Sequence, residues 1–160
     1  MSRKSESIMV TINSTVAAVQ VGSCDRQTGK DVLNNLIRMF TDELVDGRYF
    51  GYRVSGGVAT ALSTRFDHIV PVDVIVEFLL ATRLEPPLAR EIELRETIRI
   101  AQITEVEHNY LATIHLKQMM PAYWKWGDDP YERYNVAGIL LLPGEREIDA
   151  RIGAFISSTI

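Results

Sequence analysis

The sequence predicts an α+β to mainly β fold, in which long hairpins form an antiparallel sheet or sandwich with one amphipathic helix at about residues 30–46. Two observations predict this fold. Segments rich in Val, Ile and Thr recur along the chain and alternate between apolar and polar residues, as half-buried strands do. The 3.6-residue period of an amphipathic helix is clear in one segment alone. This order of elements favours a helix laid on an antiparallel sheet.

Length and composition predict a single domain over residues 1–160. The chain has 160 residues, of which 46% are hydrophobic and 24% charged, as in an ordinary globular protein. One core commonly serves about 100 to 200 residues, so we expect no second domain.

The first strand is predicted at residues 8–21, where Ile8, Val10 and Ile12 occupy alternate positions. A turn follows, and Thr28 with Asp31 resembles a capping box that opens a helix. The helix itself is predicted from an apolar stripe at helical spacing. That stripe consists of Leu33, Leu36, Ile37, Phe40 and Leu44.

Strands are predicted almost continuously after the helix. The glycines of "SGG" are suited to a tight hairpin between "RYFGYRV" and "VATALSTRF". Residues 72–80 alternate as a strand whose second face carries Ile75 and Leu79 beside two acids. We expect another subunit to bury that mixed face. Residues 91–102 alternate as well, with Ile92 on the apolar face.

The last predicted pairings are two hairpins. A polar turn at 105–109 joins the strand 91–102 to a strand at 110–119, which makes a long hairpin. The segment "YNVAGILLL" is predicted to pair with "EIDARIGAFI" across Pro143 and Gly144. A helix over 145–157 fits the same residues equally well, because their apolar positions suit both periods.

Charge and cysteine content exclude several classes of protein. The net charge of -4 and the pI near 5.4 disfavour nucleic acid as the main partner, because phosphate binding needs clustered Lys and Arg. The single Cys24 excludes an internal disulfide and a multi-cysteine metal site. No signal-peptide core and no apolar stretch of about 20 residues is present, so we expect a soluble protein made in the cytoplasm, without a membrane partner.

The sequence contains no recognisable catalytic constellation. Cys24, His68, His108 and His115 stand in no local signature of nucleophilic catalysis or zinc binding. The glycines form neither a GxGxxG motif nor a phosphate-binding loop, and Arg53 stands where a DxSxxG-type nucleotide turn has its acid. We therefore predict no enzyme activity, no cofactor and no metal.

The stretch "AYWKWGDDPYERYN" at residues 122–135 is the strongest candidate for a function. Aromatic side chains bury a large area at little entropic cost and are enriched in interface hot spots. Three interpretations remain open: a loop that covers the protein's own core, a contact between subunits, or a ligand platform. The aromatic residues are Tyr123, Trp124, Trp126, Tyr131 and Tyr134.

We hypothesise that the chain is a non-enzymatic structural subunit of a homo-oligomeric ring or tube. The predicted interface joins those five aromatic residues to Ile75 and Leu79. Such assemblies need contacts between different surface patches. The predicted sandwich with a single helix resembles the layout of phage tail-tube and neck proteins, which implies other assembly proteins as partners and incorporation into a virion.

The alternative hypothesis is a small protein that binds an apolar ligand. The predicted order of strand, helix and curled antiparallel sheet is similar to helix-grip and hotdog folds, and this resemblance implies a thioesterase or dehydratase. It predicts a cavity facing Leu33, Ile37 and Phe40. Gln102 or Glu96 would supply the polar group inside that cavity.

Overall fold

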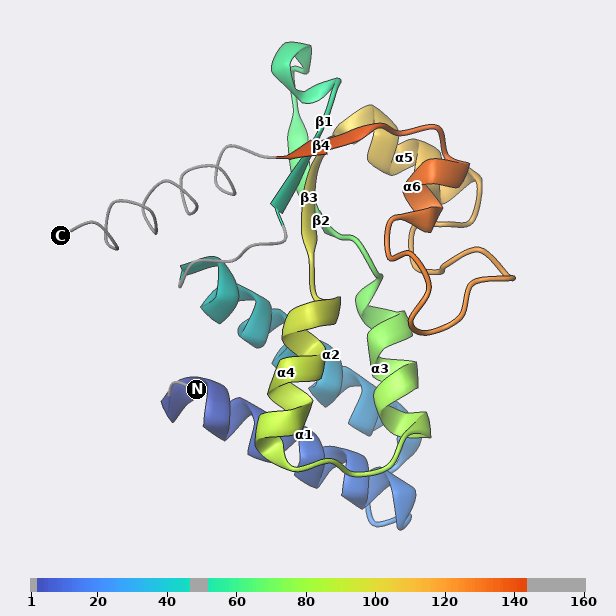
Figure 1. Cartoon of the computed structure of the whole chain (residues 1–160). Coiled ribbons are helices and arrows are strands. Elements are labelled where there is room, and N and C mark those ends of the chain that lie inside the picture. Colours follow the sequence, from blue (N-terminus) through green and yellow to red (C-terminus); the bar gives the residue numbers. More distant parts are fainter. Residues whose placement is uncertain (1–2, 47–51, 144–160) are drawn as a thin grey trace, which may run out of the picture. The chain divides into compact units, whose positions relative to one another are not determined.

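The fold of this protein is α+β, and the prediction of a mainly β sandwich is wrong. A computed structural model describes residues 3–46 and 52–143. Within these residues it contains six α-helices and a small mixed sheet of four strands (Figure 1). In chain order the elements are α1 (Arg3–Gln20), α2 (Arg26–Asp46), β1 (Tyr52–Ser55), the 3-10 helix η1 (Val58–Thr60), β2 (Thr64–His68), α3 (Val72–Ala81), α4 (Pro87–Thr97), β3 (Ile100–Thr104), α5 (Glu105–Thr113), α6 (Glu132–Val136) and β4 (Leu141–Pro143).

The chain divides into two compact units, each built from two separate stretches. In the described residues, unit 1 comprises 3–46 and 72–97, and it is helical. Unit 2 comprises 52–71 and 98–143, and it contains the sheet with α5 and α6.

Residues 8–21, predicted to form a strand, lie mainly in α1. Ile8, Met9, Ile12 and Val16 are buried, and this spacing is that of one helical face. The strand prediction placed Val10 on the same face as Ile8, but Val10 is exposed. The Thr and Ser side chains of α1 donate hydrogen bonds to carbonyl groups four residues earlier, so β-branched composition does not exclude the helix here.

The predicted helix at about 30–46 is present as part of α2. It begins at Arg26, because the Asp25 carboxylate accepts a hydrogen bond from the Thr28 backbone N–H at 2.9 Å. Asp25 is therefore the cap, three residues before the predicted Thr28. The hydrogen bonds from Thr28 also hold the pKa of Asp25 below its ordinary value.

Residues 72–80 form α3 and not a strand. The buried positions of this segment repeat at three and four residues, which is a helical period. Ile75 and Leu79 lie on that buried face, and Pro71 immediately precedes the helix, where its missing N–H costs little. The buried residues are Val72, Ile75, Val76, Leu79 and Leu80.

Of the predicted strand at 91–102, residues 91–97 lie in α4 and residues 100–102 lie in β3. In α4 the expected buried and exposed positions are partly reversed. Arg90 and Glu91 are buried, whereas Ile92 is exposed. Arg90 donates to the Arg83 carbonyl at 2.8 Å, and Arg95 donates to Glu91 at 2.8 Å. These hydrogen bonds compensate the buried charges. Of the apolar residues that alternate at 92–100, Ile92 is exposed, whereas Leu94, Ile98 and Ile100 are buried as expected.

The sheet of unit 2 has the strand order β2-β3-β1-β4. β1 and β3 are parallel, while β2 pairs antiparallel with β3 and β4 antiparallel with β1. The predicted "SGG" hairpin is therefore wrong, because β3 lies between β1 and β2. In the predicted C-terminal hairpin, Leu141–Pro143 pairs with β1, and residues 147–156 lie outside the described residues.

The predicted hairpin strand at 110–119 is replaced by α5 and the loop after it. Thr104 and Glu107 form a capping box: the Thr104 hydroxyl accepts from the Glu107 N–H at 3.1 Å, and the Glu107 carboxylate accepts from the Thr104 N–H at 2.7 Å. α5 and α6 cover the same side of the sheet (Figure 1). The core between them consists of Ile69, Ala101, Ile103, Leu111, Leu116, Tyr134 and Ile139.

Replacing Gly29 with alanine tests the packing of α1 against α2. A Cβ atom at this position would collide with Val19 Cγ2, and the χ1 angle of a helical Val is strongly restricted. We expect Gly29→Ala to lower the free energy of unfolding by about 1–3 kcal/mol, measured by urea denaturation followed by circular dichroism. The control is Gly56→Ala, where a Cβ meets no atom within 4 Å and the change should stay within about 0.5 kcal/mol. Equal stability of the two variants would contradict this packing.

Candidate functional site

The aromatic stretch lies in unit 2, mostly in the segment between α5 and α6. We call residues 121–131 the aromatic loop. Its own hydrogen bonds hold its shape: Trp124 Nε1 donates to the Asp129 carbonyl at 2.9 Å, and the Asp128 carboxylate accepts from the Lys125 N–H at 2.8 Å. Gly127 has a φ of 98°, a conformation that glycine adopts without strain. The loop is thus a compact turn, and its acids serve as turn acceptors.

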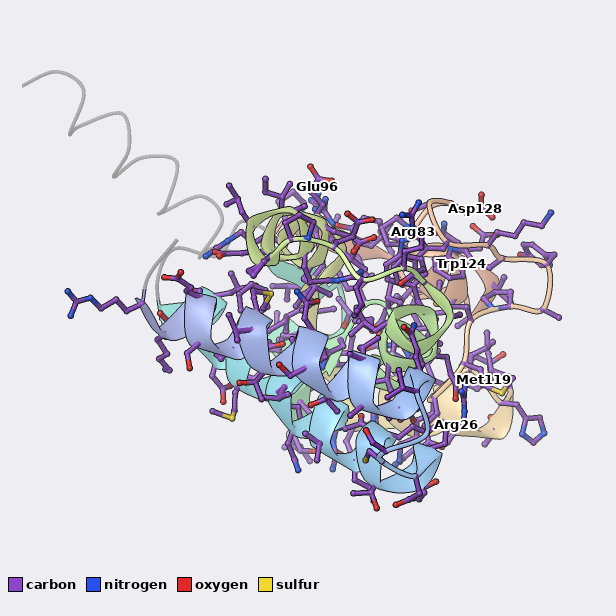
Figure 2. All side chains as sticks on the ribbon, turned by 90° about the horizontal axis from the view of Figure 1, so that it is seen from below. Arg26, Arg83, Glu96, Met119, Trp124 and Asp128 are labelled. Atoms are coloured by element: carbon purple, nitrogen blue, oxygen red, sulfur yellow. The ribbon has the colours of Figure 1, made fainter. Side chains whose placement is uncertain are left out.

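Aromatic side chains also contact one another within the loop. The rings of Trp124 and Trp126 meet edge to face, with centroids 6.3 Å apart and an interplanar angle of 75°. Both tryptophans are half-buried, whereas Tyr123 is 65% exposed. The Tyr123 hydroxyl donates to the Glu132 carboxylate at 2.6 Å, and this bond raises the pKa of the tyrosine. Figure 2 shows Trp124 and Asp128 on the loop and Met119 just before it.

α6 follows the loop and carries the fully buried Arg133 as its second residue. Its Nε donates to the Ile69 carbonyl at 2.9 Å, and its Nη1 donates to the carbonyls of Leu116 and Lys117 at 2.9 and 3.0 Å. Nη2 also donates to the His68 carbonyl. One guanidinium therefore links the end of β2 to the segment that leads into the aromatic loop.

The Arg133 guanidinium is also paired with a carboxylate. Arg133 Nη2 lies 2.6 Å from Asp67 Oδ2, and the Tyr134 hydroxyl donates to that oxygen at 2.8 Å. The guanidinium also lies over the Tyr134 ring, 4.7 Å from its centroid. Burial raises the pKa of Tyr134 well above its ordinary value. These groups satisfy one another, so the cluster stabilises the fold and offers no free nucleophile or base.

His108 is a further titratable group near this cluster. It is buried in α5, and its Nδ1 has no hydrogen-bond partner among the described residues. Burial lowers its pKa, because desolvation disfavours the charged imidazolium, while the Asp67 carboxylate opposes the shift. A neutral histidine without an adjacent nucleophile fits a core position. Within the described ranges, no group of three His, Cys, Asp or Glu residues is arranged to hold a metal ion.

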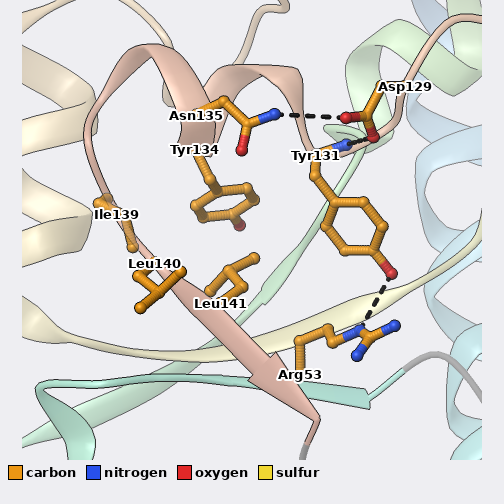
Figure 3. Close-up of a pocket in the computed structure, with 8 residues that line it drawn as sticks. All are labelled: Arg53, Asp129, Tyr131, Tyr134, Asn135, Ile139, Leu140 and Leu141. Carbon is orange, nitrogen blue, oxygen red and sulfur yellow. Dashed lines mark hydrogen bonds between the residues drawn. The ribbon is translucent and has the colours of Figure 1, made fainter.

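A pocket of about 320 Å³ lies beside the aromatic loop (Figure 3). Arg53 Nε donates to the Tyr131 hydroxyl at 3.3 Å, and the Asn135 amide donates to Asp129 at 3.3 Å. The polar lining residues are thus partly bonded to one another, and the lining also contains Ile139, Leu140 and Leu141. This arrangement suits an apolar or aromatic side chain. The pocket is lined by Arg53, Asp129, Tyr131, Tyr134, Asn135, Ile139, Leu140 and Leu141.

The predicted interface residues fall into two groups. Tyr123 is exposed, and Trp124, Trp126 and Tyr131 are half-buried in the same segment. Three others are fully buried and belong to cores: Ile75 and Leu79 in unit 1, and Tyr134 in unit 2. A fully buried side chain cannot reach another subunit while its unit stays folded, so these three positions are corrected from interface to core.

The residues named for an apolar cavity also take other places. Leu33, Ile37 and Phe40 are fully buried in the helical unit 1, where α2 contacts α1 and α3. The side chain of Gln102 donates to the Thr64 hydroxyl at 2.9 Å on the sheet of unit 2, and Glu96 is exposed on α4. The helix-on-sheet layout behind that hypothesis is therefore not the layout around α2.

Comparison with protein-family models, curated proteins and solved structures finds no match. Among the helices in the described part of the chain, none has the length and apolarity needed to cross a membrane. The function is therefore inferred from the geometry of unit 2.

Replacing Arg133 tests the buried cluster. We expect Arg133→Met to lower the free energy of unfolding by about 3–5 kcal/mol, because it leaves the Asp67 carboxylate without its cation. Both tryptophans of the sequence lie in the aromatic loop, so urea denaturation followed by tryptophan fluorescence reports on this region. The control Arg26→Met breaks an exposed pair with Glu77 and should cost about 1 kcal/mol or less. If Arg133→Met costs no more than the control, the cluster is not a main source of stability.

Proposed function

We propose that this protein is a non-enzymatic structural subunit of a homo-oligomeric assembly, and that its copies bind through the aromatic loop. The observation that carries the proposal is the combination of a loop fixed by its own hydrogen bonds with exposed side chains on it. Tyr123 is 65% exposed and Met119, just before the loop, is 60% exposed. A loop that its own hydrogen bonds already order gains little stability from a large apolar side chain that faces water.

Preorganisation supports a binding role for such a loop. Binding costs free energy when flexible segments become ordered, so a loop that is already fixed loses less on association. Tyr, Trp and Met are enriched in protein interfaces relative to other surfaces. The Trp124 and Trp126 rings support the loop from within, so Tyr123 and Met119 are the side chains that a partner meets first.

The pocket beside the loop supplies a second patch. A ring or tube requires a contact between two different surfaces of the same chain. The apolar lining residues Ile139, Leu140 and Leu141 suit an aromatic or thioether side chain from another copy. The loop of one subunit and the pocket of the next would then form a head-to-tail contact.

The chemistry of unit 2 supports a structural rather than a catalytic role. Asp67, Arg133 and Tyr134 bond to one another, and a group held in this way is not available to a substrate. The resemblance to phage tail-tube and neck proteins depended on a sandwich of strands, so the helical fold removes that support for a role in a virion. Acyl-ligand binding loses its support in the same way.

Replacing the exposed side chains at the loop tests the proposal. We expect the double variant Met119→Ser, Tyr123→Ser to raise the dissociation constant of self-association by about 30-fold or more, because truncating a hot spot costs about 2 kcal/mol. Sedimentation velocity over a range of concentrations measures this change. Both side chains are exposed, so circular dichroism should show an unchanged fold.

The matched control is Val21→Ser, which removes a 77% exposed apolar side chain from unit 1. It should leave self-association as in the original protein. Unchanged association of the double variant, or an equal loss in the control, would contradict binding through the aromatic loop.

A further inference from the structure

α4 buries charged residues and exposes apolar ones. Arg90 and Glu91 are buried, whereas Leu88 and Ile92 are 56% and 52% exposed. Leu88 and Ile92 are four residues apart, so their side chains are neighbours on one side of the helix, and the exposed Ala89 borders them. We call Leu88, Ala89 and Ile92 the outer face of α4. A helix that only faces water carries polar residues on that side, so this apolar face is suited to a partner.

The core of unit 1 does not use the outer face. Leu94 follows Ile92 by two residues and is fully buried, and two residues correspond to a rotation of about 200° around a helix. The buried Arg90 donates to the Glu93 carboxylate and to the Arg83 carbonyl, so this charge has its partners within the unit. The inner side of α4 is therefore buried in unit 1, and the outer face is left for another surface.

Charged side chains flank the outer face at both ends of α4. The loop before the helix carries the exposed Arg83 and Glu85, and the last turn of the helix carries the exposed Arg95 and Glu96. Figure 2 shows Arg83 and Glu96 at the surface. The loop is fixed, because Asn13 Nδ2 donates to the Glu85 carbonyl at 2.7 Å. Each end of α4 thus presents one cation and one anion.

We propose that α4 packs antiparallel against α4 of a second copy across a two-fold axis, with Leu88 of each copy facing Ile92 of the other. This inference rests on the proposed self-association and adds a contact in unit 1, distinct from the aromatic loop. A two-fold contact joins the same patch on both copies. The N-terminal end of each α4 therefore meets the C-terminal end of the other.

The charges at these ends favour a second copy as the partner. In the antiparallel arrangement Arg83 lies near Glu96 of the other copy, and Glu85 lies near Arg95 of the other copy. A parallel arrangement would bring each residue near its own counterpart of like charge, which opposes binding. Arg95 bonds to Glu91 through Nε and Nη2, and a guanidinium has a further nitrogen that can donate. The end charges thus complement themselves in the antiparallel arrangement.

Charge reversal tests this pairing. We expect Arg83→Glu or Glu96→Arg alone to raise the dissociation constant of self-association about tenfold, because each brings like charges together at both ends of the contact. The double variant Arg83→Glu, Glu96→Arg should recover most of the lost affinity, since opposite charges face each other again. Sedimentation velocity at low ionic strength measures these changes. Circular dichroism should show an unchanged fold, because both side chains are exposed.

The sign of the Glu96→Arg effect distinguishes this pairing from a general effect of net charge. The chain carries a net charge of -4, and Glu96→Arg makes it less negative. If net charge alone governed association, this variant would associate more strongly. Stronger or unchanged association of Glu96→Arg, or a double variant as weak as the single ones, would overturn the proposal.

Replacing the outer face tests the apolar part of the contact. We expect the double variant Leu88→Gln, Ile92→Gln to raise the dissociation constant about tenfold or more. Gln is a good helix former, so α4 should persist. The control is Val32→Gln, which replaces an exposed apolar side chain on α2 and should leave association unchanged. An equal loss in the control, or no loss in the double variant, would contradict the helix pairing.

Combining the two sets of variants separates this inference from the proposed function. If the loop variant Met119→Ser, Tyr123→Ser weakens association but the charge reversals on α4 do not, the helix pairing is wrong and the proposed function stands. If the single reversals weaken association and the double reversal restores it while the loop variant has no effect, the loop contact is wrong and the helix pairing stands.

Discussion

The buried guanidinium of Arg133 is the constraint on which unit 2 depends. It bonds to carbonyl groups at the end of β2 and after α5, and to the Asp67 carboxylate. A buried cation without these partners would cost several kcal/mol, so the segments that supply them are held in place together. α6 follows the aromatic loop directly, and fixing Arg133 therefore fixes one end of the loop.

The aromatic loop is the surface of unit 2 that the proposed self-association uses. It presents Tyr123 from a turn that its own hydrogen bonds hold. A surface that is ordered before binding loses less entropy on association. The proposed contact between this loop of one copy and the pocket of the next would be head-to-tail, and such a contact forms rings or filaments. In the proposed assembly the buried cluster acts by holding one end of the loop.

The sequence predicted the helix at about 30–46 correctly, because its apolar stripe is local information, and α2 extends it to Arg26. The strand prediction failed at α1 because the β-branched residues there fit both the strand period and the helix period. The two periods differ in whether Met9 or Val10 is buried, and the structure buries Met9. The strand prediction also failed at α4 because Arg90 takes an interior position through hydrogen bonds while Ile92 faces solvent. The pairing of Arg133 with Asp67 spans 66 residues, so nothing local predicts it. Burial of an apolar face decided the first case, and tertiary hydrogen bonding decided the other two.

The native mass of the untagged protein, measured by light scattering over a wide range of concentrations, tests the central claim most directly. The monomer mass is 18.1 kDa. Self-association predicts a mass that rises with concentration to multiples of this value. A mass that stays at 18.1 kDa up to the highest concentration would contradict a homo-oligomeric role.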